Sequence, residues 1–499
     1  MKILVFAPYA INTPHFETEL EIIQNHLDAG DEVILLACNG DLSTCDVNFP
    51  HNTAICVKCI GRRRNGIRKL SKSIEIRPIY FLQEHDKREL KRMDSNFASR
   101  EKLKQCKIEN FDVGYGILSS LISCLREPEP DLVRYRKFVH RNIISSVAVF
   151  RSMQNYLSIY KPQLVYIYNG RYAPLRAAKQ ACQSKNVQAL IHEKGSSIFQ
   201  YALYENTTPH DLSFMRRKIR ETWESNHDRS EKITKAEEFF INRSKGICKT
   251  WIPYTKDQSA GLLPTNWDSE KTNIVIFNSS EDEFEAIGEE WKNPLYNNQN
   301  DGIRMIANSL RNDDRIRIYV RIHPNLKNIV NRQTIEIHSI ASPNLTIIPA
   351  DSPVSSYTLL QNAEKIVTFG SSIGIEAVYW GVPSILAGQC YYRSFGATYN
   401  PANHDELIEM IHSDIVPKNR ETALPYGYYF NTFGIPFRHY EAEGIYNGKF
   451  RGSHVKANIA YRMAYLSLQA LYPVNLLLCT LSIMKNRLST TGTIFGNRQ

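Results

Sequence analysis

Polar side chains follow three apolar runs in the second half of the chain, each at the point where the run ends. Ser279 and Ser280 come shortly after TNIVIF, His323 follows RIRIYVRI, and Ser371 and Ser372 follow KIVTFG. The carboxyl ends of parallel strands share one edge of a sheet, where open α/β sheets bind ligands. Hydroxyls, an imidazole and small residues at such an edge suit a phosphate group. The residues expected to line this site are Ser279, Ser280, Arg321, His323, Pro324, Gly370, Ser371, Ser372 and Glu376.

A second set of polar residues follows apolar runs in the first half. Asn169 and Arg171 come after QLVYIY, and Glu193 comes at the end of VQALIHE. A carboxylate at a sheet edge, across a cleft from a phosphate site, is a candidate general base. We choose Glu193 for that role and expect Asn169, Arg171 and Glu17 to face a second substrate.

The elements that position these residues alternate between strand and helix. KILVFA and EVILLA flank a helical pattern over 16–29, and similar alternation recurs from residue 163 and again from residue 272. Such alternation predicts an α/β fold with parallel sheets. We expect an N-terminal Rossmann-like domain over 1–260, a C-terminal Rossmann-like domain over 261–435, and a helical tail over 436–499.

Composition and charge narrow the class of protein. The chain has 499 residues and a formal charge of +10, part of which lies in the run Arg62–Arg64 and the run Arg216–Arg220. Such runs either meet an anionic partner or form a solvated face. No nucleic-acid-binding pattern accompanies them, so nucleic acid is not an expected partner. The N-terminus lacks the apolar core and cleavage site of a signal peptide, which favours a cytoplasmic protein.

An apolar segment near the C-terminus has two interpretations. Met463–Arg487 is interrupted by Gln469, Pro473 and Asn475, and its unbroken part is shorter than the roughly 20 residues of a spanning helix. It is either a buried packing helix or an in-plane contact with the cytoplasmic face of the inner membrane.

Four of the ten cysteines lie close together near the N-terminus. Cys38, Cys45, Cys56 and Cys59 contain one C-x-x-C pair, and that spacing is typical of zinc sites. A four-thiolate site would be structural, because catalytic zinc keeps an open position. Free buried thiols, an iron–sulfur cluster and disulfides are the alternatives. No Asp-x-Asp motif follows a strand, so we expect no cofactor for catalysis.

These residues together carry a resemblance. The two α/β halves, His323-Pro324 and Ser371-Ser372 resemble GT-B glycosyltransferases, and more narrowly bacterial enzymes that build capsule and other surface polysaccharides. The resemblance implies two Rossmann-like domains facing across a cleft, with C-terminal helices. Sialyltransferases and Kdo transferases of this fold use the same two motifs to hold the phosphate of a CMP-sugar. Their acidic-acidic-Gly base motif is here Glu193-Lys194-Gly195, with lysine in the middle.

The resemblance implies an inverting transfer of a sugar from a nucleotide to a surface polysaccharide or glycolipid. A CMP-linked acidic sugar is our first choice of donor, and UDP- or GDP-sugars come second. Glu193 would take the acceptor proton, while His323 and the serines stabilise the leaving phosphate. Two alternatives stay open. One is a GT-B-like sugar-nucleotide epimerase or polyol-phosphate transferase, and the other is a non-catalytic, membrane-edge assembly protein of polysaccharide export.

Overall fold

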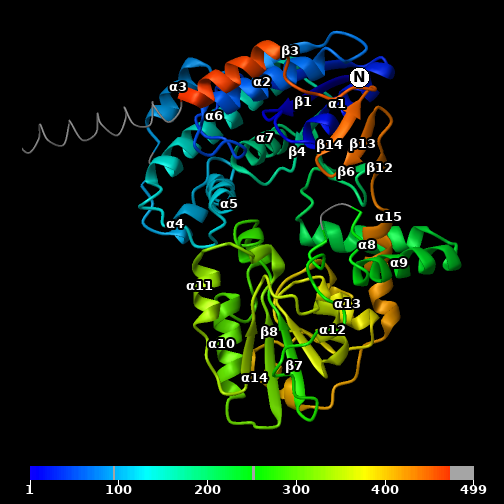
Figure 1. The fold of residues 1–499 in the computed structure, drawn as a ribbon. Helices are drawn as coiled ribbons and strands as arrows, with labels where there is room; N and C mark the ends of the chain where they lie inside the picture. Colours follow the sequence, from blue (N-terminus) through cyan, green and yellow to red (C-terminus); the bar gives the residue numbers. More distant parts are fainter. Residues whose placement is uncertain (94–95, 250–252, 472–499) are drawn as a thin grey trace, which may run out of the picture. The chain divides into compact units, whose positions relative to one another are not determined.

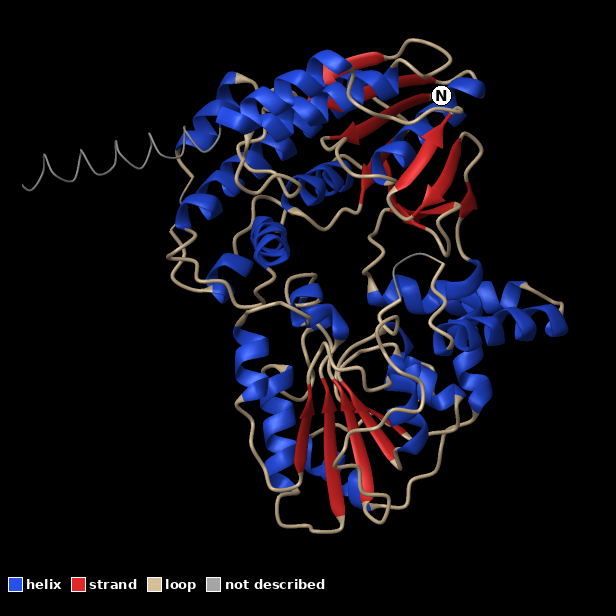
Figure 2. Cartoon of the chain, viewed as in Figure 1, coloured by secondary structure: helices blue, strands red, loops and turns tan. Residues whose placement is uncertain are grey.

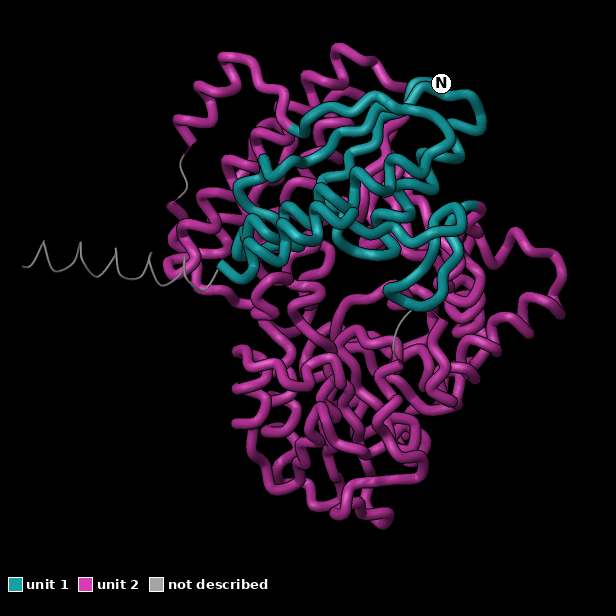
Figure 3. The backbone as a smooth tube through the Cα atoms, turned by 45° about the horizontal axis from the view of Figure 1, so that its top comes forward, with its two compact units in different colours: residues 1–79, 439–499 teal, residues 80–438 magenta. Residues whose placement is uncertain are grey.

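The computed structural model describes residues 1–93, 96–249 and 253–471, which belong to two compact units (Figure 1). Unit 1 combines residues 1–79 with the chain from His439 onward, and unit 2 is residues 80–438. Figure 3 shows that unit 1 takes its residues from both ends of the chain. This division differs from the expected boundaries at 260 and 435, because the chain after His439 returns to the N-terminal elements.

Unit 1 is built on three parallel strands. β1 pairs with β2 and β2 pairs with β3. Five consecutive residues of β1 and of β2 are buried, as expected of strands covered on both faces. The elements of this unit are β1 (Lys2–Ala7), α1 (His15–Asp28), β2 (Glu32–Ala37), α2 (Thr53–Ile67), β3 (Glu75–Pro78), β13 (Tyr440–Gly444) and β14 (Asn447–Phe450).

The C-terminal part of unit 1 contains a β-hairpin where a helical tail was expected. Strands β13 and β14 pair antiparallel, and a helix follows over 459–471. The buried carboxylate of Glu21, on α1, accepts hydrogen bonds from the main-chain N–H groups of His439 (2.8 Å) and Tyr440 (3.0 Å). This contact joins the two ends of the chain within unit 1.

The first part of unit 2 carries a second set of strands. β4 and β5 are parallel, whereas β6 and the short β12 are antiparallel to their neighbours. Helix α15 packs against α8 and α9. The elements are α3 (Glu84–Lys91), α4 (Arg100–Lys104), α5 (Val113–Leu125), α6 (Arg136–Tyr160), β4 (Leu164–Tyr168), α7 (Ala173–Ser184), β5 (Gln188–Lys194), β6 (Gln200–Glu205), α8 (Leu212–Ser225), α9 (Arg229–Ser244), α15 (Leu424–Thr432) and β12 (Ile435–Pro436).

The second part of unit 2 is a five-stranded parallel sheet in the order β11-β10-β7-β8-β9. Its strand ends and the loops after them gather at one edge (Figure 2). The elements are β7 (Thr272–Phe277), α10 (Gln299–Ser309), β8 (Ile316–Arg321), α11 (Arg332–His338), β9 (Leu345–Ile348), α12 (Ser356–Asn362), β10 (Lys365–Thr368), α13 (Ile373–Tyr379), β11 (Ser384–Leu386) and α14 (His404–His412).

Alternating side chains of this sheet build a core on each face. Ile274 and Ile276 pack with apolar residues of α10, α11 and α14, whereas Val275 and Phe277 pack with those of α12 and α13. Figure 1 shows these two groups of helices on opposite faces. The predicted α/β class and its parallel strands are therefore confirmed.

One expectation lies largely outside the described residues. Of the apolar segment Met463–Arg487, only residues 463–471 are described, and they are helical. Among the described residues, no helix combines the length and apolarity needed to cross a membrane.

Candidate functional site

Strand register brings the predicted site residues to one edge. Phe277 of β7 lies opposite Arg321 of β8 and Thr368 of β10. Ser279, His323 and Gly370 each lie two residues beyond these aligned positions. The side-chain oxygen of Asn278 accepts a hydrogen bond from the main-chain N–H of His323 (2.7 Å), which joins two of the loops.

His323 presents one ring nitrogen as a donor. Its Nδ1 accepts a hydrogen bond from the main-chain N–H of Asn325 at 3.1 Å, so in the neutral ring Nε2 carries the proton. Burial lowers the pKa of His323 to about 4, and the positive charges of Arg321, Arg243 and Arg126 act in the same direction. The edge of the Tyr254 ring packs against the imidazole, with centroids 4.9 Å apart. His323 is therefore a neutral hydrogen-bond donor near pH 7.

The loop after β10 depends on a glycine. Gly370 has φ +131°, and a Cβ there would lie 2.5 Å from the carbonyl oxygen of Gln389. Ser371 is partly exposed, and its main-chain N–H donates to Oγ1 of Thr368 at 3.1 Å. Ser372 instead donates to Glu376 at 2.8 Å and accepts from Arg243 at 3.0 Å. Oγ of Ser371 accepts from the main-chain N–H of Ile373 at 3.4 Å, so its hydroxyl proton can still be donated to a ligand. Helix α13 is short, with seven residues.

Several predicted nucleotide contacts serve the loops themselves. The buried guanidinium of Arg321 donates to the carbonyl oxygens of Pro349 and Ser352. The buried carboxylate of Glu376 accepts from Arg243, Ser372 and Tyr357.

Two other strand-end residues also have fixed surroundings. Ser279 is buried, and the partly buried Pro324 begins the 3₁₀ turn Pro324–Leu326. Ser280 donates to Asp282, two residues away. These groups therefore stabilise the loops at the edge, while His323 and Ser371 lie partly exposed beside them.

The first half of unit 2 brings Asn169 and Glu193 together. The amide nitrogen of Asn169 donates to Oε2 of Glu193 at 2.9 Å, and the main-chain N–H of Lys194 donates to Oε1 at 3.1 Å. Burial raises the pKa of Glu193, although both hydrogen bonds oppose that effect. The role of Glu193 as the general base remains a prediction.

Arg171 reaches from the loop after β4 to the loop after β7. Its Nε donates to Ser119 at 3.0 Å, and its terminal nitrogens donate to the main-chain oxygens of Glu283 (2.8 Å) and Asp282 (3.4 Å). The side chain is 6% exposed. Arg171, Glu283 and Gly370 line one cavity of about 320 Å³.

Arg126 holds the same loop from α5. Its guanidinium donates to the carboxylate of Asp282, to Ser280 Oγ (3.3 Å) and to the carbonyl oxygen of Asn325 (3.4 Å). The carbonyl oxygen of Arg126 accepts from Asn331 at 2.6 Å.

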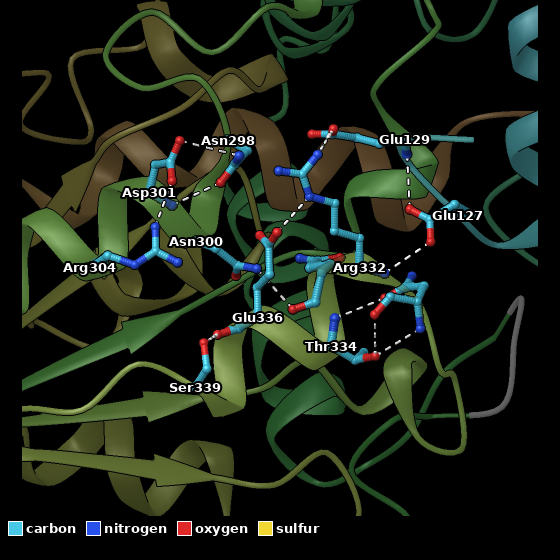
Figure 4. Close-up of polar contacts among 12 residues, drawn as sticks. Glu127, Glu129, Asn298, Asn300, Asp301, Arg304, Arg332, Thr334, Glu336 and Ser339 are labelled. Carbon is cyan, nitrogen blue, oxygen red and sulfur yellow. Dashed lines mark hydrogen bonds and ion pairs between the residues drawn. The ribbon is translucent and has the colours of Figure 1, made fainter. Parts of the chain in front are cut away.

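The segment after Arg126 is held by the start of α11. The Arg332 side chain lies between Glu129 and Glu336, and its main-chain N–H donates to Glu127 at 2.9 Å (Figure 4). No sequence motif surrounds Arg126 or Arg243. By contrast, Glu283 and Asn325 lie within the polar stretches SSEDE and HPN, where strand ends signal a site.

Unit 1 contains the predicted acceptor residue Glu17 and the cysteines. Glu17 is buried and forms an ion pair with Arg62, which is also buried together with Arg63. The arginine run is thus largely internal at these two positions, and contact of Glu17 with an acceptor remains a prediction.

The four clustered cysteines line one small cavity together with His51. Cys56 and Cys59 lie on α2, one turn apart. Three sulfurs accept hydrogen bonds, from Ala10 N–H (3.2 Å, Cys59), Gly40 N–H (3.4 Å, Cys38) and Asn48 Nδ2 (3.4 Å, Cys56). Within the described residues, no three His, Cys, Asp or Glu side chains are arranged to hold a metal ion.

A comparison with known protein families matches part of unit 2. Residues 291–416 match the family model "Capsule polysaccharide biosynthesis protein", and this match confirms the expected resemblance over that stretch. No curated protein was found to match the sequence.

Solved structures show distant likenesses. KpsC β-Kdo 2,4-transferase of Thermosulfurimonas dismutans is 15% identical with a TM-score of 0.34, covering 54% of this chain and 78% of that chain. The UDP-GlcNAc 2-epimerase of Neisseria meningitidis is 11% identical with a TM-score of 0.26, covering 86% and 97%. Likenesses of this size carry no argument about activity, so the chemistry has to be argued from the site residues.

The neutral state of His323 predicts a pH dependence of stability. Its pKa of about 4 lies below the unfolded value of about 6.5, so the unfolded chain binds the extra proton between these limits. Stability attributable to this residue is therefore lost as the pH falls from about 6.5 toward 4. Urea unfolding should show a smaller loss of free energy from pH 7 to pH 5 in His323→Gln than in the unsubstituted protein. His227 is exposed, so His227→Gln is the matched control. If the free energy of unfolding changes equally with pH in all three proteins, His323 is not neutral as assigned.

Proposed function

We propose that the chain is a glycosyltransferase of capsule or surface polysaccharide synthesis. The observation that carries the proposal is the register of β7, β8 and β10, which sets Ser279, His323 and Gly370 each two residues beyond aligned positions at one sheet edge. The family match over residues 291–416 supports the assignment, since it covers two of these three strand ends.

The proposed reaction is a direct displacement with inversion at the anomeric carbon. An acceptor hydroxyl attacks that carbon while the bond to the nucleotide phosphate breaks. The Nε2–H of His323 and the hydroxyl of Ser371 donate to the phosphate oxygens as negative charge develops on them. Fixed donors aimed at a developing charge lower the barrier, typically by about 3–4 kcal/mol for one donor.

A CMP-linked acidic sugar is the proposed donor, with UDP- and GDP-sugars as the rivals. The support is the pairing of His323-Pro324 with Ser371-Ser372, which resembles the CMP-sugar enzymes. The buried, positively charged Arg171 in the adjoining cavity is compatible with an acidic sugar, because its hydrogen-bond acceptors are one hydroxyl and two main-chain carbonyls.

Nucleotide binding at the strand edge predicts a thermal shift. A ligand at about 100 times its dissociation constant stabilises a protein by about 2.7 kcal/mol, which raises the melting temperature by several degrees. CMP should stabilise the protein more than UDP or GDP does. Gly370→Ala should remove the shift, because its Cβ would meet the Gln389 carbonyl. Gly381→Ala is the matched control, since φ is +77° there and nothing lies within 4 Å. The proposal fails if CMP, CDP, UDP and GDP all leave the melting temperature unchanged.

A structural zinc at the four clustered cysteines is a separate proposal. It is supported by the C-x-x-C spacing of Cys56 and Cys59 and by the cavity that the four cysteines share.

Metal analysis tests the zinc proposal. Protein purified without chelators should contain about one zinc per chain, as a closed four-thiolate site requires. Cys56→Ser combined with Cys59→Ser should lose the metal and lower the melting temperature, whereas Cys182→Ser, outside the cluster, should retain the metal. Metal-free protein with an unchanged melting temperature would rule the site out.

Peripheral contact with the cytoplasmic face of the inner membrane is also proposed. On the helix over 459–471, Ile459, Met463 and Leu466 are 78%, 59% and 56% exposed and share one face. Tyr461 packs against α2 with its ring 5.5 Å from the Arg64 guanidinium carbon. The apolar face is thus left to solvent or lipid.

Vesicle flotation tests the membrane contact. The full-length protein should float with phosphatidylglycerol vesicles, and Met463→Glu combined with Leu466→Glu should reduce the bound fraction by about tenfold. Val330→Glu, at an 85% exposed position of unit 2, should leave flotation unchanged. Equal flotation of all three proteins would exclude this helix as the contact.

A further inference from the structure

The cavity around Arg171 adjoins the predicted phosphate site. Gly370, whose loop carries Ser371, lines it together with Glu283 and Arg171. Its volume of about 320 Å³ is at the lower end of the range for small-molecule sites, about 300–1,000 Å³. The cavity therefore suits one sugar unit placed between the phosphate loop and a carboxylate.

Glu283 is fixed at the sheet edge through the same residue that orients His323. The side-chain nitrogen of Asn325 donates to Oε1 of Glu283 at 2.6 Å, while its main-chain N–H donates to Nδ1 of His323 at 3.1 Å. One asparagine thus sets both the carboxylate and the imidazole in relation to each other.

The main chain of Glu283 is held as firmly as its side chain. It ends the 3₁₀ turn Glu281–Glu283, and its carbonyl oxygen accepts from Arg171 at 2.8 Å. The preceding carboxylate, Asp282, is paired with Arg126. Part of the surface of Glu283 is open to solvent, and the residue is among those that line the cavity.

The surroundings of Glu283 make it a stronger base than a solvated glutamate. Desolvation raises its pKa, and the charge of Asp282 adds to that effect, whereas Arg126 and Arg171 oppose it. His210 also lines the cavity, but burial and the charges of Arg171 and Arg176 lower its pKa to about 3. A histidine that weakly basic is a poor proton acceptor near neutral pH.

Glu193, the base expected from the sequence, has a different position. Its carboxylate is bound by Asn169 and by its neighbour's main chain, and it is not among the residues that line this cavity. We propose that the cavity lined by Gly370, Arg171 and Glu283 is the reaction site, and that Glu283 is its general base. This inference rests on the proposed glycosyltransferase function.

The proposed step balances without a cofactor. The proton of the acceptor hydroxyl passes to the carboxylate of Glu283. The acceptor oxygen forms a bond to the anomeric carbon with its electron pair. The bond from that carbon to the phosphate oxygen breaks, and the nucleotide leaves with those electrons. His323 Nε2–H donates to the departing phosphate, and Glu283 then releases its proton to water.

The test compares three isosteric variants of the full-length protein. Release of nucleotide is measured with CMP-N-acetylneuraminate, UDP-N-acetylglucosamine and GDP-mannose, with water or added saccharide as acceptor. Glu283→Gln should lower kcat by about 10²–10⁴-fold, the usual contribution of a general base. Its CMP-induced thermal shift should remain. The acid limb of the pH profile, which reports loss of the deprotonated base, should disappear from its residual activity.

One variant is the matched control. Glu281→Gln changes the carboxylate two residues earlier, which lines a separate cavity and accepts from Gln299 N–H at 2.5 Å. It should keep kcat within about threefold of the unsubstituted enzyme. Glu193→Gln tests the rival base expected from the sequence. Full kcat in Glu283→Gln, or a loss confined to Glu193→Gln, would overturn the assignment while leaving the proposed function intact. Absence of turnover and of any nucleotide shift in the unsubstituted protein would overturn the proposed function itself.

Discussion

Three arginines hold the loops of the five-stranded sheet from outside that sheet. Arg171 binds the turn after β7 through its carbonyls, Arg126 binds the same turn through Asp282, and Arg243 binds Glu376 and Ser372. The guanidinium of Arg171 is withdrawn from water and must find acceptors, whereas the side chains of Arg126 and Arg243 are 33% and 36% exposed. The five donors of each guanidinium lie in one plane. Each arginine therefore fixes the position of several loop atoms at once.

This constraint explains how short polar loops can form a defined site. The three loops begin at the same level of the sheet, because Phe277, Arg321 and Thr368 are in register. The three arginines then hold the loops beyond these positions, and few polar groups of the loops remain for a ligand. His323 keeps one N–H as a donor, and Glu283 is one of the residues that line the cavity. Donors and a carboxylate fixed beforehand need little reorganisation during a reaction.

The sequence predicted the strands and their ends well, for a simple physical reason. A strand buried on both faces reads as an apolar run, and its last residue is marked by the first polar ones, as at Ser279 and Ser371. It did not predict the burial of the arginine run on α2. The run indicated either contact with an anionic partner or a solvated face, yet Arg62 and Arg63 are buried. Their partners, such as Glu17, lie far away in sequence.

Long-range partners also explain what was missed at the site. Nothing local distinguishes Arg126 from other charged helix residues, since its role depends on Asp282 and Asn325, more than 150 residues away. Glu283 was within a recognised polar loop, but only the fold places it in the same cavity as Gly370. The return of the chain to Glu21 at His439 is likewise a tertiary contact without a local pattern.

The central claim is that the edge formed by β7, β8 and β10 binds the phosphate of a nucleotide. A crystal structure of the full-length protein with CMP tests it most directly. The account predicts a phosphate within hydrogen-bond distance, about 3 Å, of His323 Nε2 and Ser371 Oγ, with the cavity of Glu283 beside it. CMP bound elsewhere on the protein, with both of these side chains uncontacted, would contradict the account.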